Sequence, residues 1–592
     1  MKLRTTMYKH IFIFFIPVFF LGLGVHAQED EGEDEEGLGT ETVTVTKAYT
    51  PTISDAFKIK SLPEMNDSIV LQKKKIDYTI FSVPVASTFT PAKGKAATVK
   101  KTPPPILFNS YASVGAGNPG NVLADFYTSR AIGREDRLDL GLTHNSSRGD
   151  FDDVFFDNKF SDSKLDASYS QRDRDFDWVA NVGFQHQLYN WYGTPEGALD
   201  LVTVDEKDAR QNYFMGEVST KLNMADSFFK SGELLYRRFW DSYKSGENRV
   251  VFEPVFDFPI TDEELSLGAK VDWVNGKFEN ASLNNTDNTP EIKYNNLQVG
   301  LNPNLKILRD NLTLRLGAKF IYGMDLENSD GSFHIYPDVT ASYRLLDDVA
   351  IAYGGIVGDL RQNSYYGFID ENPFVSPTLS MQPTDQQYDA YVGLKGQLFA
   401  NLSYNIKGSY KAENRLPLFK LNPSNASRGE GPYVFGNSFD VFYDDVKTFG
   451  VFGELNVDVN RNFALGINAE YYSYNTETDN PAWNLPDLTG SLFMDYQIGE
   501  KWYMGANLFY VGKRSDISSV AVPSTPANLF ASEIIELDGY FDANAHIGYR
   551  LNKQLSIFVK AANIANNNYQ RWANYQVQGL QILGGATYKF DF

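Results

Sequence analysis

The chain has 592 residues, with 75 Asp+Glu against 54 Lys+Arg, a formal net charge of −21 and no cysteine. The lack of cysteine excludes disulfide frameworks, thiolate metal sites and cysteine nucleophiles. The acidic balance argues against a nucleic-acid binder, because phosphate affinity depends on Lys and Arg. The mean hydropathy of −0.34 is that of a soluble protein, yet 14% of the residues are aromatic. A membrane β-barrel reconciles the two values, since only alternate side chains face lipid.

Residues 1–27 have the pattern of a secretory signal peptide. Basic residues precede an apolar run from Ile11 to Val25, which ends at Val25-His26-Ala27, a sequence of the kind that signal peptidase reads. The run is about 15 residues long and a spanning helix needs about 20, which favours cleavage over the alternative of an uncleaved anchor. No later stretch approaches 18 apolar residues. A mature chain in a membrane would therefore cross it as a closed barrel.

Residues 28–105 have the composition of a periplasmic tail. Seven acidic residues lie within Gln28–Gly37, and the stretch Pro91–Pro105 is rich in Lys and Pro. A run of like charges and a proline tract predict a mostly disordered segment that ends in a stiff linker.

Residues 106–308 contain ten candidate strands. The segment 247–259 is weak because it contains Pro254 and Pro259, and 151–160 is left out. The candidates are 106–116, 121–132, 137–145, 163–172, 177–190, 211–225, 229–242, 247–259, 264–278 and 291–308.

From Leu312 onward the alternation of apolar and polar residues is clearer and predicts twelve more strands. Leu402–Lys411, for example, places Leu, Tyr, Ile, Gly and Tyr on one face and Ser, Asn, Lys, Ser and Lys on the other. Strands of about ten residues are long enough to cross a bilayer at a tilt. The predicted fold class is an all-β transmembrane antiparallel β-barrel over residues 106–592, with about 22 strands and 16 to 22 possible.

Aromatic placement and turn lengths separate a membrane barrel from a soluble sandwich. The face Trp502/Met504/Ala506/Leu508/Tyr510 has aromatic residues at both ends and smaller apolar residues between, as expected where strand ends meet lipid headgroups. Short polar turns such as Asp347-Asp348 and Gly499-Glu500 alternate with long segments. This alternation is typical of periplasmic turns and extracellular loops.

The last strand, Ile582–Phe592, ends the chain on an aromatic residue. Tyr588, Phe590 and Phe592 share one face of that strand. An amphipathic strand with an aromatic final residue resembles the signal that the barrel assembly machinery recognises, so these three residues are the candidate assembly signal.

The segment Leu537–Leu555, continued by Ile557–Ile564 and Tyr569, resembles the last three strands of TonB-dependent receptors. Glu371-Asn372-Pro373-Phe374 is similar to the long loop in the middle of those barrels. The resemblance covers roughly residues 310–592 and looks like the Bacteroidota form of the family. It implies an outer-membrane location, with outer-membrane lipids and the barrel assembly machinery as partners.

The resemblance also implies a plug domain ahead of the barrel, but residues 28–105 are too few for one, so the barrel is expected to lack it. Part of this segment resembles the box that contacts TonB, where an extended strand joins the edge of a partner's sheet. The alternative is a short β-prone stretch without such a role. The candidate box comprises Glu41, Thr42, Val43, Thr44, Val45 and Thr46.

Catalytic chemistry and cofactors are not predicted. The His residues outside the signal lie on separate strands without ligand spacing, and acidic loop pieces such as Asp150–Asp153 lack the regular spacing of a Ca²⁺ loop. Two functions are compatible with the sequence: ligand uptake across the outer membrane, and a plugless barrel that serves as an accessory or scaffold subunit. Uptake would use loop aromatic residues that stack on sugars or peptides, namely Tyr365, Tyr366, Tyr433, Trp483 and Trp572. No residue is assigned to a particular ligand.

A barrel of this width without a plug would leave a wide opening. We therefore expect residues 40–100, the long loops or a partner to fill it.

Overall fold

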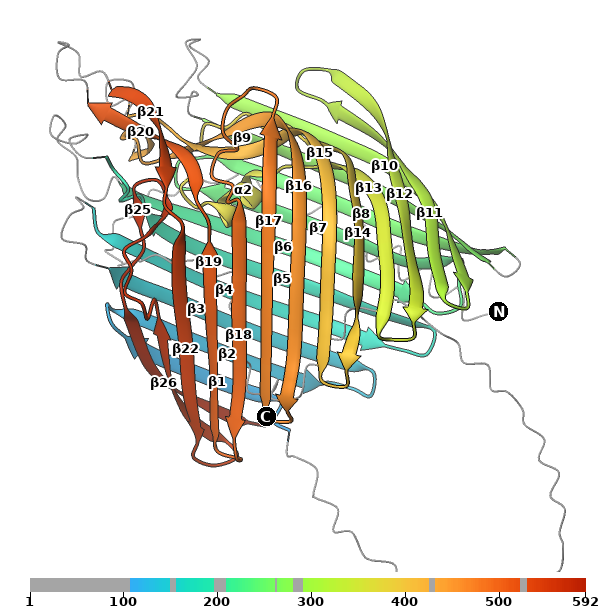
Figure 1. The fold of residues 1–592 in the computed structure, drawn as a ribbon, viewed down its shortest axis with the longest axis horizontal. Coiled ribbons are helices and arrows are strands. Elements are labelled where there is room, and N and C mark those ends of the chain that lie inside the picture. The colour runs from blue at the N-terminus through green and yellow to red at the C-terminus, as the bar shows by residue number, and fades with distance from the viewer. Residues whose placement is uncertain are drawn as a thin grey trace, which may run out of the picture. The chain divides into compact units, whose positions relative to one another are not determined.

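A computed structural model describes residues 107–149, 156–195, 209–260, 263–279, 291–424, 432–521 and 530–591. Their main feature is one 22-stranded antiparallel sheet, which closes because the first strand pairs with both the second and the last (Figure 1). The predicted fold class is thereby confirmed. The predicted signal peptide, tail, TonB-box-like segment Glu41–Thr46 and the final Phe592 lie outside the described residues and stay predictions, as does the missing plug.

The strands of the barrel follow one another around the ring in chain order. Each of the ten strands predicted before residue 310 is observed. The predicted strand that contains Pro254 is also present, and Glu253 and Pro254 have no pairing partner on the next strand. The strands are β1 Ser110–Gly117, β2 Asn121–Ala131, β3 Asp136–Gly149, β4 Asn158–Arg172, β5 Phe176–Asn190, β6 Arg210–Met224, β7 Phe229–Asp241, β8 Gly246–Ile260, β9 Glu263–Phe278, β10 Ile292–Arg309, β11 Leu312–Asp325, β12 Asp330–Leu346, β13 Ala350–Arg361, β14 Thr384–Phe399, β15 Leu402–Leu421, β16 Phe439–Asn460, β17 Phe463–Thr476, β18 Leu488–Ile498, β19 Trp502–Val511, β22 Tyr540–Arg550, β23 Leu555–Ala562 and β26 Gln581–Phe590.

The remaining elements lie in the long connections. They are the helix α2 Tyr365–Glu371, the 3₁₀ turn η3 Pro432–Val434, the hairpin β20 Arg514–Ala521 with β21 Phe530–Leu537, and the short pair β24 Gln570–Trp572 with β25 Tyr575–Gln576. Among the described residues, none of the helices is long and apolar enough to span a membrane.

The seam between β1 and β26 joins the two ends of the barrel sequence. It runs from Ser110 opposite Phe590 to Gly117 opposite Leu583, and the hydroxyl oxygens of Ser113 and Thr587 lie 2.8 Å apart inside it. Tyr588 is exposed on the outer face, and its ring stacks beside that of Phe590. Their role in assembly stays a prediction.

The outer surface of the barrel is apolar. On β16, the alternate residues Phe449, Val451 and Leu455 are each more than 40% exposed, while Glu454 lies on the opposite face. A closed sheet that exposes its apolar face everywhere is built to contact lipid, which leaves its polar face lining the lumen.

The long connections lie at one end of the strands, and the connections at the other end are short, as predicted. Asp310, Asp347 and Gly499 adopt positive φ angles of 36°, 42° and 60° in the short turns, a conformation that Gly tolerates and Asp adopts more readily than bulky residues. Three connections at the long-loop end are also short, namely β1–β2 (118–120), β7–β8 (242–245) and β11–β12 (326–329). By the asymmetry of outer-membrane barrels, that end is the extracellular one.

Candidate functional site

The β13–β14 connection carries α2 at the extracellular end of the barrel. Ser364 caps the helix, since its hydroxyl oxygen accepts the Gly367 N–H at 3.1 Å. A seven-residue helix is too short to be stable alone. It is held by burial of Tyr365, Phe368 and Ile369 against residues of other connections.

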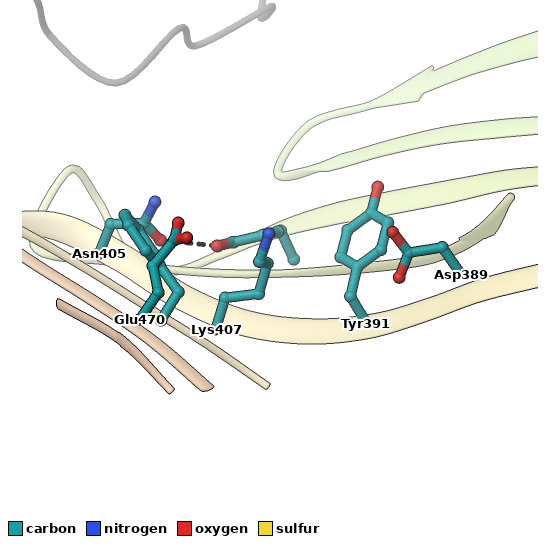
Figure 2. Close-up of a pocket in the computed structure, with 7 residues that line it drawn as sticks. Asp389, Tyr391, Asn405, Lys407 and Glu470 are labelled. Carbon is teal, nitrogen blue, oxygen red and sulfur yellow. Dashed lines mark hydrogen bonds between the residues drawn. The ribbon is translucent and has the colours of Figure 1, made fainter. Parts of the chain in front are cut away.

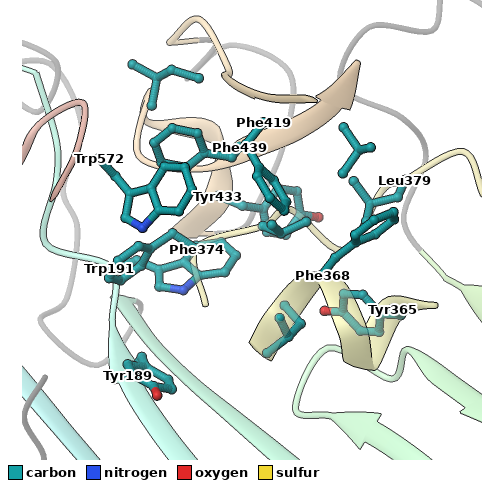
Figure 3. Packing of buried hydrophobic residues seen from close by; sticks show 14 of the residues in the cluster. Tyr189, Trp191, Tyr365, Phe368, Phe374, Leu379, Phe419, Tyr433, Phe439 and Trp572 are labelled. Atoms are coloured by element: carbon teal, nitrogen blue, oxygen red, sulfur yellow. The ribbon is translucent and has the colours of Figure 1, made fainter. Parts of the chain in front are cut away.

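These residues belong to a large buried cluster, here called the lid, which gathers side chains from the extracellular connections and the strand ends beside them (Figure 3). At its centre the rings of Phe374 and Tyr575 stack with centroids 3.6 Å apart, although they lie in different connections. Principal members are Trp191, Tyr192, Tyr365, Phe368, Phe374, Leu379, Phe419, Tyr433, Phe439, Trp483, Trp572 and Tyr575.

The lid reaches across the barrel. Trp191 follows β5, and its carbonyl oxygen accepts a hydrogen bond of 2.8 Å from the side-chain amide of Asn437, which precedes β16. The fifth and sixteenth strands are eleven steps apart in a ring of 22, so they stand on opposite sides. On the same side as Trp191, the Tyr213 hydroxyl donates to the Pro373 carbonyl oxygen at 2.7 Å. Of the three predicted ways to fill the opening, the long loops are the one that the described residues show.

Two buried carboxylates fix α2 to the wall of β7 and β8. Glu247 Oε2 accepts the Tyr365 N–H at 2.6 Å and the Tyr294 hydroxyl at 2.8 Å. Asp241 Oδ2 accepts the Tyr365 hydroxyl at 2.9 Å. Buried carboxylates require such donors because their desolvation is costly. The first turn of α2 is thereby tied to the barrel by directional bonds in addition to apolar contact.

A third buried carboxylate, Asp516 of β20, joins three connections. It accepts the Leu421 N–H at 2.9 Å, the Asn484 side-chain amide at 2.7 Å and the Ile517 N–H at 2.8 Å. Burial raises the pKa of Asp516 to about 6, and these hydrogen bonds together with the nearby Lys420 only partly oppose the shift.

The raised pKa of Asp516 makes the lid sensitive to pH. Since the pKa is higher in the closed lid than in an exposed Asp, the stabilisation from protonation is complete only below about pH 4 and is lost as pH rises through about 6. At about 1.4 kcal/mol per pKa unit, it amounts to at most about 3 kcal/mol. We expect hydrogen exchange, corrected for intrinsic rates, to show greater protection of the Leu421 amide at pH 5 than at pH 8. Asp516→Asn should flatten this dependence, and an unchanged profile in that variant would refute the assignment.

The loop aromatic residues expected to face a ligand are instead packed within the lid. Tyr365, Tyr433, Trp483 and Trp572 are all buried, and Tyr366 packs against the cluster with the Arg237 guanidinium 4.1 Å from its ring centroid. The correction has a simple physical cause: loops from several strands meet at this end, and their aromatic residues bury one another.

Below the lid the lumen wall is dense with ion pairs. Examples are Arg237–Glu217, Arg249–Asp272 and Lys319–Asp359, with closest N···O distances of 2.6, 2.8 and 3.0 Å. These side chains point inward because their neighbours along each strand face lipid. The lumen is therefore a polar surface that carries several ion pairs.

A hollow of about 330 Å³ opens on this wall among β13 to β17 (Figure 2). The inward alternation of β15 was visible in the sequence, but the hollow itself depends on how five strands align. It is lined by Tyr353, Asp389, Tyr391, Asn405, Lys407, Phe452 and Glu470.

Within the described part of the chain, no group of three or more His, Asp or Glu is arranged to hold a metal ion. The four mature-chain His residues lie on different strands, and His144, for instance, has Ser163 and Ser146 as hydrogen-bond partners. Asp150–Asp153 lies outside the described residues. The predicted lack of a cofactor or metal stays a prediction.

No protein-family model matches the sequence, and no curated protein matches it. Solved structures do match the fold. The pyoverdine outer-membrane receptor FpvA from Pseudomonas aeruginosa PAO1 is 14% identical with a TM-score of 0.59, over 82% of this chain and 78% of that one. The siderophore receptor PirA from Acinetobacter baumannii is 12% identical with a TM-score of 0.59, over 81% and 80%. The ferric-catecholate import receptor Fiu from Escherichia coli K12 is 11% identical with a TM-score of 0.56, over 82% of each chain.

The 22-stranded barrel thus has the fold of these receptors, and the cell outer membrane is where a barrel with this lipid-facing surface resides. Each of the three neighbours is a receptor. The Bacteroidota affinity stays a prediction, since identities of 11–14% establish the fold alone.

Proposed function

We propose that this protein takes up a ligand across the outer membrane through its lumen, with the lid as the gate. One observation carries the proposal: the extracellular connections form a buried cluster that crosses a wide, polar barrel. A permanent scaffold has no need of a polar conduit that loops close at its extracellular end. Uptake through a gated barrel needs both a polar lumen and a lid that can open.

The energy for opening the gate is proposed to come from TonB through the candidate box Glu41–Thr46. Its alternation of Thr and Val suits an extended strand that adds to the edge of a partner's sheet. Lipids of the outer membrane and the barrel assembly machinery, acting on Tyr588, Phe590 and Phe592, complete the proposed partners.

The gate can be tested without knowing the ligand, because the chain has no native cysteine. Lys164→Cys would place a thiol on the lumen side of β4, where the Lys164 side chain is 44% exposed. In energised cells that overproduce the protein, we expect a maleimide polymer too large for general porins to label this thiol. Labelling should fall to background when the proton-motive force is dissipated or when residues 41–46 are deleted.

Glu327→Cys, in the exposed β11–β12 connection, is the control and should be labelled in every condition. Labelling of the lumen thiol that does not respond to energy or to deletion of the box would refute TonB-driven opening. A lumen thiol that is never labelled, together with recovery of the barrel in a stable complex, would favour the accessory-subunit function.

A further inference from the structure

Three of the residues that line the hollow are aromatic, namely Tyr353, Tyr391 and Phe452. Figure 2 shows Tyr391 among the polar residues of the hollow. The Tyr353 ring lies against Gly393, where a Cβ atom would come within 2.5 Å of it, and the Tyr391 hydroxyl lies 2.9 Å from the position of a Cβ at Gly355. The two rings are 6.2 Å apart and inclined at 52°. Glycine on the neighbouring strands thus allows both tyrosines to lie against the wall.

A hydrogen bond also orients one polar group of the hollow. The Tyr353 hydroxyl donates to Asn405 Oδ1 at 2.6 Å. That bond occupies the carbonyl of the amide and leaves its NH₂ group to donate to something else.

Two charges of the hollow differ from the inward carboxylates on the strands beside it. Asp338 of β12 and Asp359 of β13 each form an ion pair, with Arg315 and Lys319 respectively. In the hollow, neither Asp389 nor Lys407 forms an ion pair or hydrogen bond with a described side chain, and Asp389 Oδ1 is shielded from solvent without a partner. The Lys407 ammonium lies 5.8 Å from the centre of the Phe452 ring. A shielded carboxylate oxygen without a donor marks a place where a ligand's donor would fit.

The strand register fixes the spacing of these two charges. Lys407 lies opposite Gly393, which is four residues along β14 from Asp389, and Tyr391 lies between them on the same face. At about 3.3 Å per residue the two positions are about 13 Å apart. An extended peptide of about four residues spans the same length.

We propose that the hollow binds a zwitterionic oligopeptide of about four residues. Its amino group pairs with Asp389, its carboxylate with Lys407, and its side chains rest on Tyr353, Tyr391 and Phe452. A neutral sugar would also suit the aromatic residues but would leave both charges unmatched, so the peptide is favoured. The peptide is thus the ligand class for the uptake proposed above. Passage of the peptide through the barrel rests on that proposed function, whereas its binding can be measured on purified protein.

The test is calorimetric titration of the full chain in detergent with the tetrapeptide Ala-Tyr-Ala-Ala. Its N-acetylated and C-amidated forms and the neutral sugar maltotetraose serve as further probes. Asp389→Asn should weaken binding of the free peptide by about tenfold and leave binding of the N-acetylated form unchanged. Lys407→Gln should weaken binding of the free peptide by a similar factor and leave the C-amidated form unchanged. A factor of ten is what one charge-assisted hydrogen bond contributes.

Asp495→Asn on β18 and Lys221→Gln on β6 remove inward charges outside the hollow and should leave peptide binding unchanged. The proposal is overturned if the tetrapeptide does not bind, if maltotetraose binds in its place, or if each variant affects blocked and free peptides alike. The result of the titration does not depend on the gate, because titration involves no energised step. If the peptide binds but the thiol of Lys164→Cys is never labelled, the uptake function is refuted and the peptide site stands.

Discussion

Replacement of residues 364–381 by a short Gly-Ser linker is expected to convert a barrel that conducts little current into one with a large, steady conductance. The replacement removes α2, Phe374 and Leu379, which pack against lid residues of several other connections. A ring of 22 strands is wide enough to hold an aqueous channel unless something fills it. Single-channel recording in a planar bilayer should show an increase of at least an order of magnitude over the wild type.

The matched control for this experiment is deletion of Glu327–Ser329. These residues form the exposed tip of another extracellular connection and contribute nothing to the lid. That variant should conduct like the wild type. A wild type with a large, permanently open pore would show that the lid does not close the lumen, and a closed barrel after loss of α2 would show that another part of the chain does.

The strands were predictable from the sequence because each one separates two solvents. Alternation over Leu312–Tyr322 or Phe449–Val459 reports lipid on one side and water on the other, and the structure exposes the apolar residues of both runs. Pro254 did not prevent strand formation, since it lies at an irregular point of the β8–β9 pairing. A local pattern was therefore enough to predict 22 strands.

The lid could not be predicted in the same way, because its contacts join residues far apart in the chain. Asn437 and Trp191 are separated by 246 positions, and Tyr575 and Phe374 come from connections on different strands. The sequence alone does not distinguish an aromatic loop residue that faces a ligand from one that packs against another loop. Only the closure of the ring brings these loops together, so the sequence favoured exposure where the structure has burial.

The hollow was predictable only in part, unlike the strands, which were predictable, and the lid, which was not. The inward positions of Asp389, Tyr391, Asn405 and Lys407 follow from alternation, but their grouping depends on the register of β14 against β15. The pairing of the surrounding charges is equally invisible in one sequence. Asp389 and Lys407 differ from the ion-paired Asp338 and Asp359 on the neighbouring strands, since neither forms an ion pair with a described residue.

Glu247→Ala is expected to open the lid without removing any of its apolar side chains. The substitution leaves the buried Tyr365 N–H and Tyr294 hydroxyl without an acceptor, and each such donor costs about 1–3 kcal/mol. Loss of the carboxylate's own desolvation cost offsets part of this, so we expect the closed state to lose about 3 kcal/mol in all. The open fraction should then rise by roughly a hundredfold.

The measurement is labelling of Lys164→Cys in de-energised cells, where the intact lid should protect the thiol. Glu247→Gln keeps one carbonyl acceptor for the Tyr365 N–H and should give an intermediate rate, whereas Glu253→Ala, on the same face of β8 but 47% exposed, should behave like the wild type. Equal labelling of all three variants would mean that apolar packing alone holds the lid. A graded series would show that the gate depends on one buried carboxylate beneath the first turn of α2, which is where a ligand or a pulling partner would have to act to open it.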